Sequence, residues 1–78
     1  MVSMTEEQLL QKIGKRIKEV RRKRSFSQLQ LAAILESEKS AISRLESGKL
    51  NMKITTLYRL AKALDVSLSE LLKIHEDK

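Results

Sequence analysis

Apolar residues recur along this chain at intervals of three and four, the period of an amphipathic helix, and the strict alternation of a strand is missing. The pattern begins after Thr5, which forms a capping box with Gln8 and so marks the start of a helix. Gly14 interrupts that helix, and we expect it to permit close packing at this point. The inward stripe of the helix consists of Leu10, Ile13, Ile17 and Val20.

Four shorter helices follow. Ser27 with Gln30 and Ser67 with Glu70 are two more capping boxes, which predict the starts of the second and fifth helices. The third helix lies within residues 37–51 and ends near Gly48, and the fourth runs from about Ile54 to Leu64. The chain has no proline and two glycines, so its loops are short. We predict an all-α fold, with one five-helix domain over residues 1–78.

The third helix is short and polar, and its outer face is chemically distinctive. Ile42 and Leu45 define its inner face. With Ile42 set to zero and about 100° per residue, the outward side at about 100–200° holds Ser40, Ser43, Arg44 and Ser47. Lys39 lies in the first turn, where its long side chain can reach outward. A merely solvated face is usually built from Glu, Lys and other good helix formers, whereas short hydroxyls let a helix approach another surface closely. Serine and arginine are also suited to base edges in a DNA major groove.

Composition narrows the classes of function. Sixteen Lys and Arg residues against ten Asp and Glu residues give a net charge of +6, which favours a polyanionic partner. The chain has one histidine and no cysteine, so neither a catalytic triad nor a zinc site can be assembled, and we expect neither an enzyme nor a cofactor or metal. No signal peptide or membrane-spanning run is visible, so we expect a cytoplasmic protein without a membrane partner.

Seven cations crowd the segment 15–24, "KRIKEVRRKR", and avoid its apolar stripe. Three interpretations are open for them: a solvated face, a patch that attracts DNA phosphates, or a helix on a membrane surface. Membrane binding is disfavoured because the apolar stripe of this helix is needed for the core.

Three motifs carry a family resemblance: Gln-x-x-Leu-Ala at residues 28–32, Ile-Ser-Arg-Leu-Glu-x-Gly-Lys at 42–49, and Ala-Leu-Asp-Val-Ser-x-x-Glu-Leu-Leu at 63–72. In combination they resemble the Xre/Cro-type, lambda-repressor-like helix-turn-helix family of bacterial and phage repressors. The resemblance covers about residues 13–72. It implies that the second and third helices form the helix-turn-helix, with the third in the DNA major groove.

The resemblance also implies roles for particular residues. It places Lys39, Ser40 and Arg44 at base-reading positions, with Ser43 beside them. It assigns phosphate contacts to Gln28 and, in the loop that follows the third helix, to Ser47, Lys49 and Asn51. In many relatives a glutamate at the place of Glu46 pairs with an arginine at the place of Arg21. Arg21 also belongs to the cationic run, where it could simply be solvated; if the pair is buried, it is structural.

The turn between the second and third helices departs from the family pattern of a glycine, an apolar residue and a small capping residue. Glu36, Ser37 and Glu38 occupy these places. Because a left-handed backbone at Glu36 would cost about 1–2 kcal/mol, we expect a turn of different shape or a longer second helix. Ser37 also gives the turn less apolar packing.

Together these observations predict a sequence-specific regulator of transcription that binds double-stranded DNA. We expect a repressor that binds a two-fold operator as a homodimer. The candidate dimer surface is Leu68, Leu71 and Leu72, which could instead simply close the core of the monomer. Open alternatives are an antitoxin with a toxin as its protein partner, a restriction-modification controller, and a protein-interaction module that does not read DNA.

Overall fold

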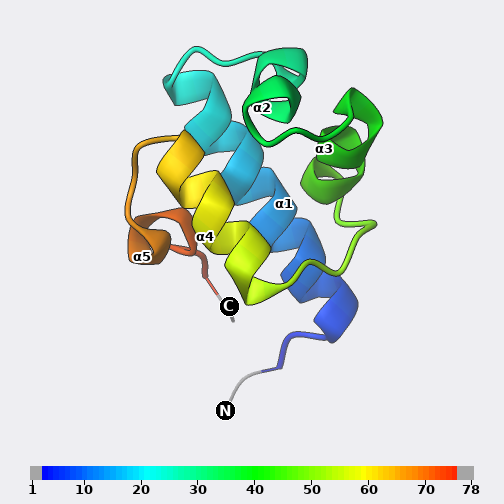
Figure 1. Ribbon diagram of the computed structural model, residues 1–78. Coiled ribbons are helices and arrows are strands. Elements are labelled where there is room, and N and C mark those ends of the chain that lie inside the picture. The colour runs from blue at the N-terminus through cyan, green and yellow to red at the C-terminus, as the bar shows by residue number, and fades with distance from the viewer. Residues whose placement is uncertain (1–2, 76–78) are drawn as a thin grey trace.

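The computed structural model describes residues 3–75, and its helices follow one another where the sequence predicts them. They are α1 (Glu6–Lys23), α2 (Gln28–Ile34), α3 (Lys39–Glu46), α4 (Ile54–Ala63) and α5 (Leu68–Leu71). No strand occurs within residues 3–75, so the fold is all-α, as predicted. Figure 1 shows α1 running through the length of the molecule, with α2 and α3 on one flank and α5 on the other.

Side-chain caps define the starts of α1 and α2. The Thr5 hydroxyl accepts from the backbone N–H of Gln8 at 3.1 Å, and the Gln8 amide oxygen accepts from the Thr5 N–H at 3.0 Å. Ser27 and Gln30 repeat this exchange at 3.0 and 2.8 Å. Each predicted box therefore satisfies two backbone donors at the start of its helix.

The third predicted capping box is only half present. The Ser67 hydroxyl accepts from the backbone N–H of Glu70 at 3.0 Å. The Glu70 carboxylate does not complete the box, because it accepts from the Arg16 guanidinium at 2.7 Å. A charged donor makes the stronger hydrogen bond, so the side chain of Glu70 ties α5 to α1 instead.

The core is aliphatic and draws on every helix. Its largest fully buried side chains are Ile17, Leu31, Ile42, Leu60, Leu64 and Leu71. Ile42 and Leu45 of α3 are 1% and 4% exposed, so the underside of this short helix is anchored in the core. Its opposite side stays free.

Gly14 is the point where α1 meets α3. A Cβ atom at this residue would lie 2.4 Å from the backbone oxygen of Leu45 and 2.7 Å from that of Glu46. These separations are far below van der Waals contact, so any larger residue would push the two helices apart. The expected close packing at Gly14 is confirmed, and it fixes the depth at which α3 sits.

Each of α1 to α4 ends in the same hydrogen-bonded turn. The residue after each C-cap has a positive φ: 63° at Ser25, 54° at Glu36, 77° at Gly48 and 59° at Asp65. The next backbone N–H then reaches back five residues, as from Ser37 to the oxygen of Ala32 at 2.8 Å. This is the Schellman arrangement, which satisfies carbonyls that the helix end leaves free.

The expectation for the helix-turn-helix turn was therefore wrong. α2 ends at Ile34, and Glu36 takes the left-handed conformation that a glycine normally occupies. Two backbone hydrogen bonds close the turn, from Glu36 to Ala33 at 3.1 Å and from Ser37 to Ala32. They offset the cost of the left-handed glutamate, so the turn keeps the shape that presents α3.

None of the helices in the described part of the chain is long and apolar enough to cross a membrane.

Candidate nucleic-acid interface

The outer face of α3 is open to solvent along its whole length. Lys39, Ser40, Ser43 and Arg44 are all exposed. The Ser40 hydroxyl has one weak contact, 3.5 Å from a carboxylate oxygen of Glu38. Neither the Lys39 ammonium nor the Arg44 guanidinium makes a hydrogen bond or ion pair within residues 3–75. The donors of this face are therefore available to an incoming ligand.

The predicted phosphate-contacting residues after α3 lie in an exposed loop. Ser47 caps the end of α3, and its hydroxyl donates to the backbone oxygen of Arg44 at 3.2 Å. Lys49 and Asn51 follow in the segment that leads to α4, and both are exposed. Gly48 has φ 77°, so the chain turns sharply here. Because Ser47 lies on the exposed, outward side of α3, the loop begins next to the outer face.

Beneath that face, Arg21 and Glu46 form a buried ion pair, as the family resemblance implied. Their side chains are 8% and 3% exposed. The guanidinium donates to both carboxylate oxygens of Glu46, through Nε to Oε2 and through Nη2 to Oε1 at 3.0 Å. A further donor of Arg21, Nη1, bonds the backbone oxygen of Phe26 at 2.8 Å. The pair therefore holds α1, α3 and the start of α2 together.

Gln28 has a structural role that the sequence did not reveal. Its amide nitrogen donates to Oε1 of Glu46 at 3.0 Å, so it joins the ion pair from the first residue of α2. One amide N–H is thereby used. The second amide N–H remains, together with the backbone N–H of a first helical residue, which has no partner within its helix. These two N–H groups are the donors that Gln28 can offer to a phosphate at the start of α2.

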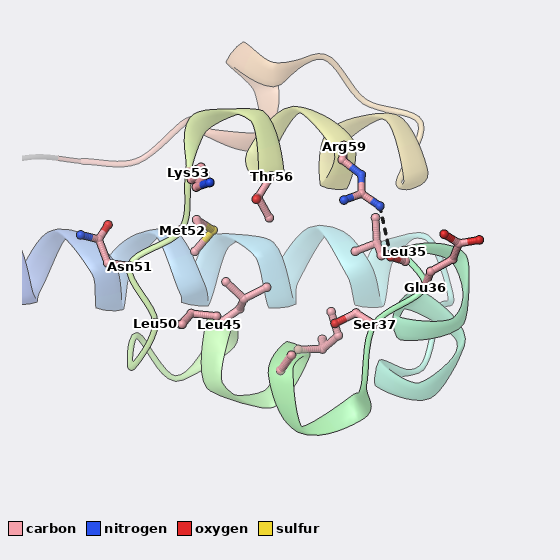
Figure 2. A pocket seen from close by; sticks show the side chains of 12 residues that line it. Leu35, Glu36, Ser37, Leu45, Leu50, Asn51, Met52, Lys53, Thr56 and Arg59 are labelled. Carbon is pink, nitrogen blue, oxygen red and sulfur yellow. Dashed lines mark hydrogen bonds between the residues drawn. The ribbon is translucent and has the colours of Figure 1, made fainter.

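A pocket of about 440 Å³ lies between the α2–α3 turn and α4, and sequence reasoning missed it. Figure 2 shows Leu45, Leu50 and Met52 at its base, with Thr56 and Arg59 projecting from α4 on the other side. Arg59 spans the two walls and donates to the backbone oxygen of Leu35 at 3.1 Å. Ser37 lines the pocket where the family pattern has an apolar residue. The serine at this position was the one feature of the sequence that indicated a gap behind α3.

The predicted dimer surface must be corrected at one residue. Leu71 is 0% exposed and belongs to the core, so no second molecule can reach it. It fills the inward position of α5, which is a single turn of four residues. Leu68 and Leu72 are half-buried and pack against the core with part of their surface uncovered.

Comparison with known proteins agrees with this geometry. The helix-turn-helix family model HTH_3 matches residues 17–71, which include the ion pair, α2, the turn and α3. The chain belongs to this family. The match supports the resemblance to Xre/Cro-type proteins that the three sequence motifs indicated.

Three relatives are informative within this helix-turn-helix family. The transcriptional regulator PuuR of Escherichia coli (strain K12) is 40% identical over 57 residues, which are 73% of this chain and 31% of PuuR. The competence pilus inhibition repressor of Acinetobacter baylyi is 34% identical over 83% of this chain and 59% of its own length. The chain thus spans about a third of one curated relative and three fifths of the other. The crystal structure of the restriction-modification controller protein C.AhdI from Aeromonas hydrophila has a TM-score of 0.76 and 34% identity, covering 80% of this chain and 90% of C.AhdI.

Proposed function

We propose that this helix-turn-helix protein is a sequence-specific DNA-binding regulator of transcription that acts in the cytoplasm as a repressor. The observation that carries the proposal is the free outer face of α3, where Lys39, Ser40, Ser43 and Arg44 are exposed above a buried aliphatic underside. Relatives named as a transcriptional regulator and as a repressor support it.

The chemistry of this face fits the major groove. That groove is wide enough to admit an α-helix, and the short side chains of Ser40 and Ser43 let this side of α3 approach the base edges closely. The Arg44 guanidinium presents a planar fork that matches the O6 and N7 acceptors of guanine. Serine hydroxyls can donate to or accept from base edges or phosphates. In this arrangement α3 reads bases, and Gln28, Ser47, Lys49 and Asn51 hold the phosphates on either side.

A homodimer on a two-fold operator completes the proposal. One module of this size offers few base contacts, whereas two modules related by two-fold symmetry read half-sites about one helical turn apart. Leu68 of α5 and Leu72 at its C-cap, both half-buried, form the proposed contact between copies, and α5 lies on the flank opposite α3 (Figure 1). Occupancy near a promoter would exclude or reposition RNA polymerase.

Selection of bound duplexes from a random pool tests this function. The expected product is an inverted repeat whose half-site centres are about 10 base pairs apart. A variant carrying Ser43→Glu should lose this enrichment, because a carboxylate on the outer face of α3 would be repelled by the DNA. The matched control is Thr55→Glu, on the exposed side of α4. If the unaltered protein enriches no sequence, it is a protein-interaction module instead.

A second candidate is a controller of a restriction-modification system. The supporting observation is the likeness to C.AhdI, of which this chain covers 90% at 34% identity. Such a controller would use the same face of α3 and the same DNA chemistry, so the two candidates differ in the genes that are regulated. A restriction endonuclease gene and a methyltransferase gene beside the coding sequence, with an operator upstream of them, would favour the controller.

A further inference from the structure

The seven cations of the segment 15–24, which covers the second half of α1 and its C-cap, divide into two groups. Three of them hold the fold together: Arg16 donates to the backbone oxygen of Glu70 at 2.9 Å, Arg21 donates to Glu46, and Arg24 donates to the backbone oxygen of Asp65 at 2.8 Å. The others in the segment 15–24 make no hydrogen bond or ion pair with residues 3–75; they are Lys15, Lys18, Arg22 and Lys23. A solvated face and a binding surface remain as explanations for this second group.

Three of these four cations share one ridge of α1. Relative to Ile17, and at about 100° per residue, Lys18, Arg22 and Lys15 lie at about 100°, 140° and 160°, whereas Lys23 lies at about 240°. The first three line a hollow of about 450 Å³ together with Glu19 and Glu46. Like charges three and four residues apart on a helix repel one another, so this grouping costs stability unless an anion binds nearby.

Both acidic residues that line the hollow are paired with an arginine outside it. Glu46 is held by the Arg21 guanidinium, and Glu19 lies 3.8 Å from a guanidinium nitrogen of Arg16. The three remaining cations therefore have no acid of their own to neutralise them within the described residues. The local field around this hollow is positive, and a negatively charged ligand is expected there.

The hollow lies beside the proposed DNA-reading face. Glu46, one of its lining residues, belongs to α3 and is adjacent on that helix to the flank that carries Ser43 and Ser47. Glu46 also accepts from the side-chain amide of Gln28, the first residue of α2. The start of α2 and the ridge of α1 thus both lie next to Glu46, at the end of α3.

We propose that Lys15, Lys18 and Arg22 form a track for the sugar–phosphate backbone of duplex DNA, alongside the segment that α3 reads. The inference rests on the proposed function and extends the contacted surface to α1. The track carries no sequence information, since ammonium and guanidinium groups bind phosphates irrespective of the base. Its effect is on affinity and on the salt dependence of affinity, because each neutralised phosphate releases condensed counterions.

Salt titration of DNA binding tests the track. The double variant Lys18→Gln with Arg22→Gln is compared with the double variant Lys23→Gln with Lys62→Gln, which removes the same charge from exposed positions outside the hollow. Binding to the selected duplex and to a random duplex is measured at several salt concentrations. In the track variant the slope of log K against log salt should become shallower by about 2, equally for both duplexes, because each lost phosphate contact removes about 0.9. Adding Lys15→Gln should remove about one more.

The outcomes separate the track from the function on which it rests. Equal slopes for the two double variants, with DNA binding intact, would refute the track and leave the proposed regulator standing. A track variant that changes the preferred sequence would also refute it, because a base-reading role would then belong to these residues. If the unaltered protein binds no duplex at any salt concentration, both proposals fail. The thermal melt of the track variant should match that of the unaltered protein, since neither Lys18 nor Arg22 makes a hydrogen bond or ion pair within residues 3–75. The control variant loses the contact of the Lys62 ammonium with the Tyr58 ring, 5.3 Å from the ring centroid, so its free energy of unfolding should fall by no more than about 0.5–1 kcal/mol.

Discussion

Arg21 and Glu46 combine two costs that proteins usually avoid, burial of charge and immobilisation of long side chains. Burying either group alone would be strongly unfavourable, and the pair is tolerable because Glu46 accepts from both Arg21 and Gln28. No buried polar side-chain atom lacks a partner among the described residues. The reason to keep such a pair is geometrical. It links α1, α2 and α3 at one point directly beneath the face proposed to meet DNA.

Loss of either partner should be severe. In Arg21→Ala or Glu46→Ala one buried charge is left without its partner, and we expect the free energy of unfolding to fall by about 3–5 kcal/mol. Denaturant melts followed by circular dichroism measure this loss. Arg22→Ala, the neighbour without a partner within residues 3–75, should change the free energy by less than about 0.5 kcal/mol. Midpoints close to that of the unaltered protein for both Arg21→Ala and Glu46→Ala would refute the structural role of the pair.

At the scale of the helices, the starts follow the usual residue preferences more closely than the ends do. The starts of α1, α2 and α5 each carry a side-chain cap. The ends of α1, α2 and α4 place Ser25, Glu36 and Asp65 in the left-handed conformation, where glycine would be unstrained. These turns are therefore stabilised by their backbone hydrogen bonds and by the packing of the helices, and each stores strain.

The turn before α3 offers a direct test of that strain. Glu36→Gly removes the steric cost of a left-handed glutamate, about 1–2 kcal/mol, and loses part of this gain to the greater freedom of glycine in the unfolded chain. We expect a net stabilisation of about 0.5–1 kcal/mol, seen as a higher denaturant midpoint. Glu36→Val should do the opposite, because a β-branched side chain is worst suited to positive φ. A lower midpoint for Glu36→Gly would show that the Glu36 side chain stabilises the turn in another way.

The contrast between helix caps and helix-ending turns shows which features could be predicted from the sequence. Helix starts were predictable because Thr5 and Ser27 act on residues three positions away. The order of the helices and the outward side of α3 followed from spacing alone, and the pairing of Arg21 with Glu46 followed from family resemblance. The engagement of Glu70 by Arg16, 54 positions away, was not predictable, because it depends on how α5 docks on α1. The same holds for Gln28, which reaches Glu46 because α2 and α3 pack closely.

At the scale of the whole molecule, the docking of α3 against α1 produces three features together. α3 is pressed into the core so deeply that its backbone touches Gly14 of α1. This leaves a rigid underside, a free outer face and, beside it, a ridge of α1 cations without partners within residues 3–75. On the opposite flank, Leu68 of α5 and Leu72 at its C-cap are partly uncovered. The surfaces proposed for DNA and for a second copy are therefore separate and can be tested independently.

The proposed dimer predicts concentration-dependent sedimentation. Leu72→Glu should shift the protein toward monomer, with dimerisation weakened by about tenfold or more, because burial of a leucine is worth about 1.5–3 kcal/mol. Leu29→Glu on α2, where the leucine is 64% exposed, is the matched control and should leave association unchanged. The dimer would be contradicted if the unaltered protein sediments as a monomer at all concentrations, with and without operator DNA.

The most direct measurement of the central claim, that the outer face of α3 reads base pairs, is the affinity of Arg44→Ala for the selected duplex and its single base-pair substitutions. The account predicts a loss of about 1–3 kcal/mol on the selected duplex and the disappearance of preference at one position in each half-site, with other positions unchanged. Lys62→Ala, on the exposed side of α4, should keep every preference. Arg44→Ala binding with the full preference of the unaltered protein would contradict the account.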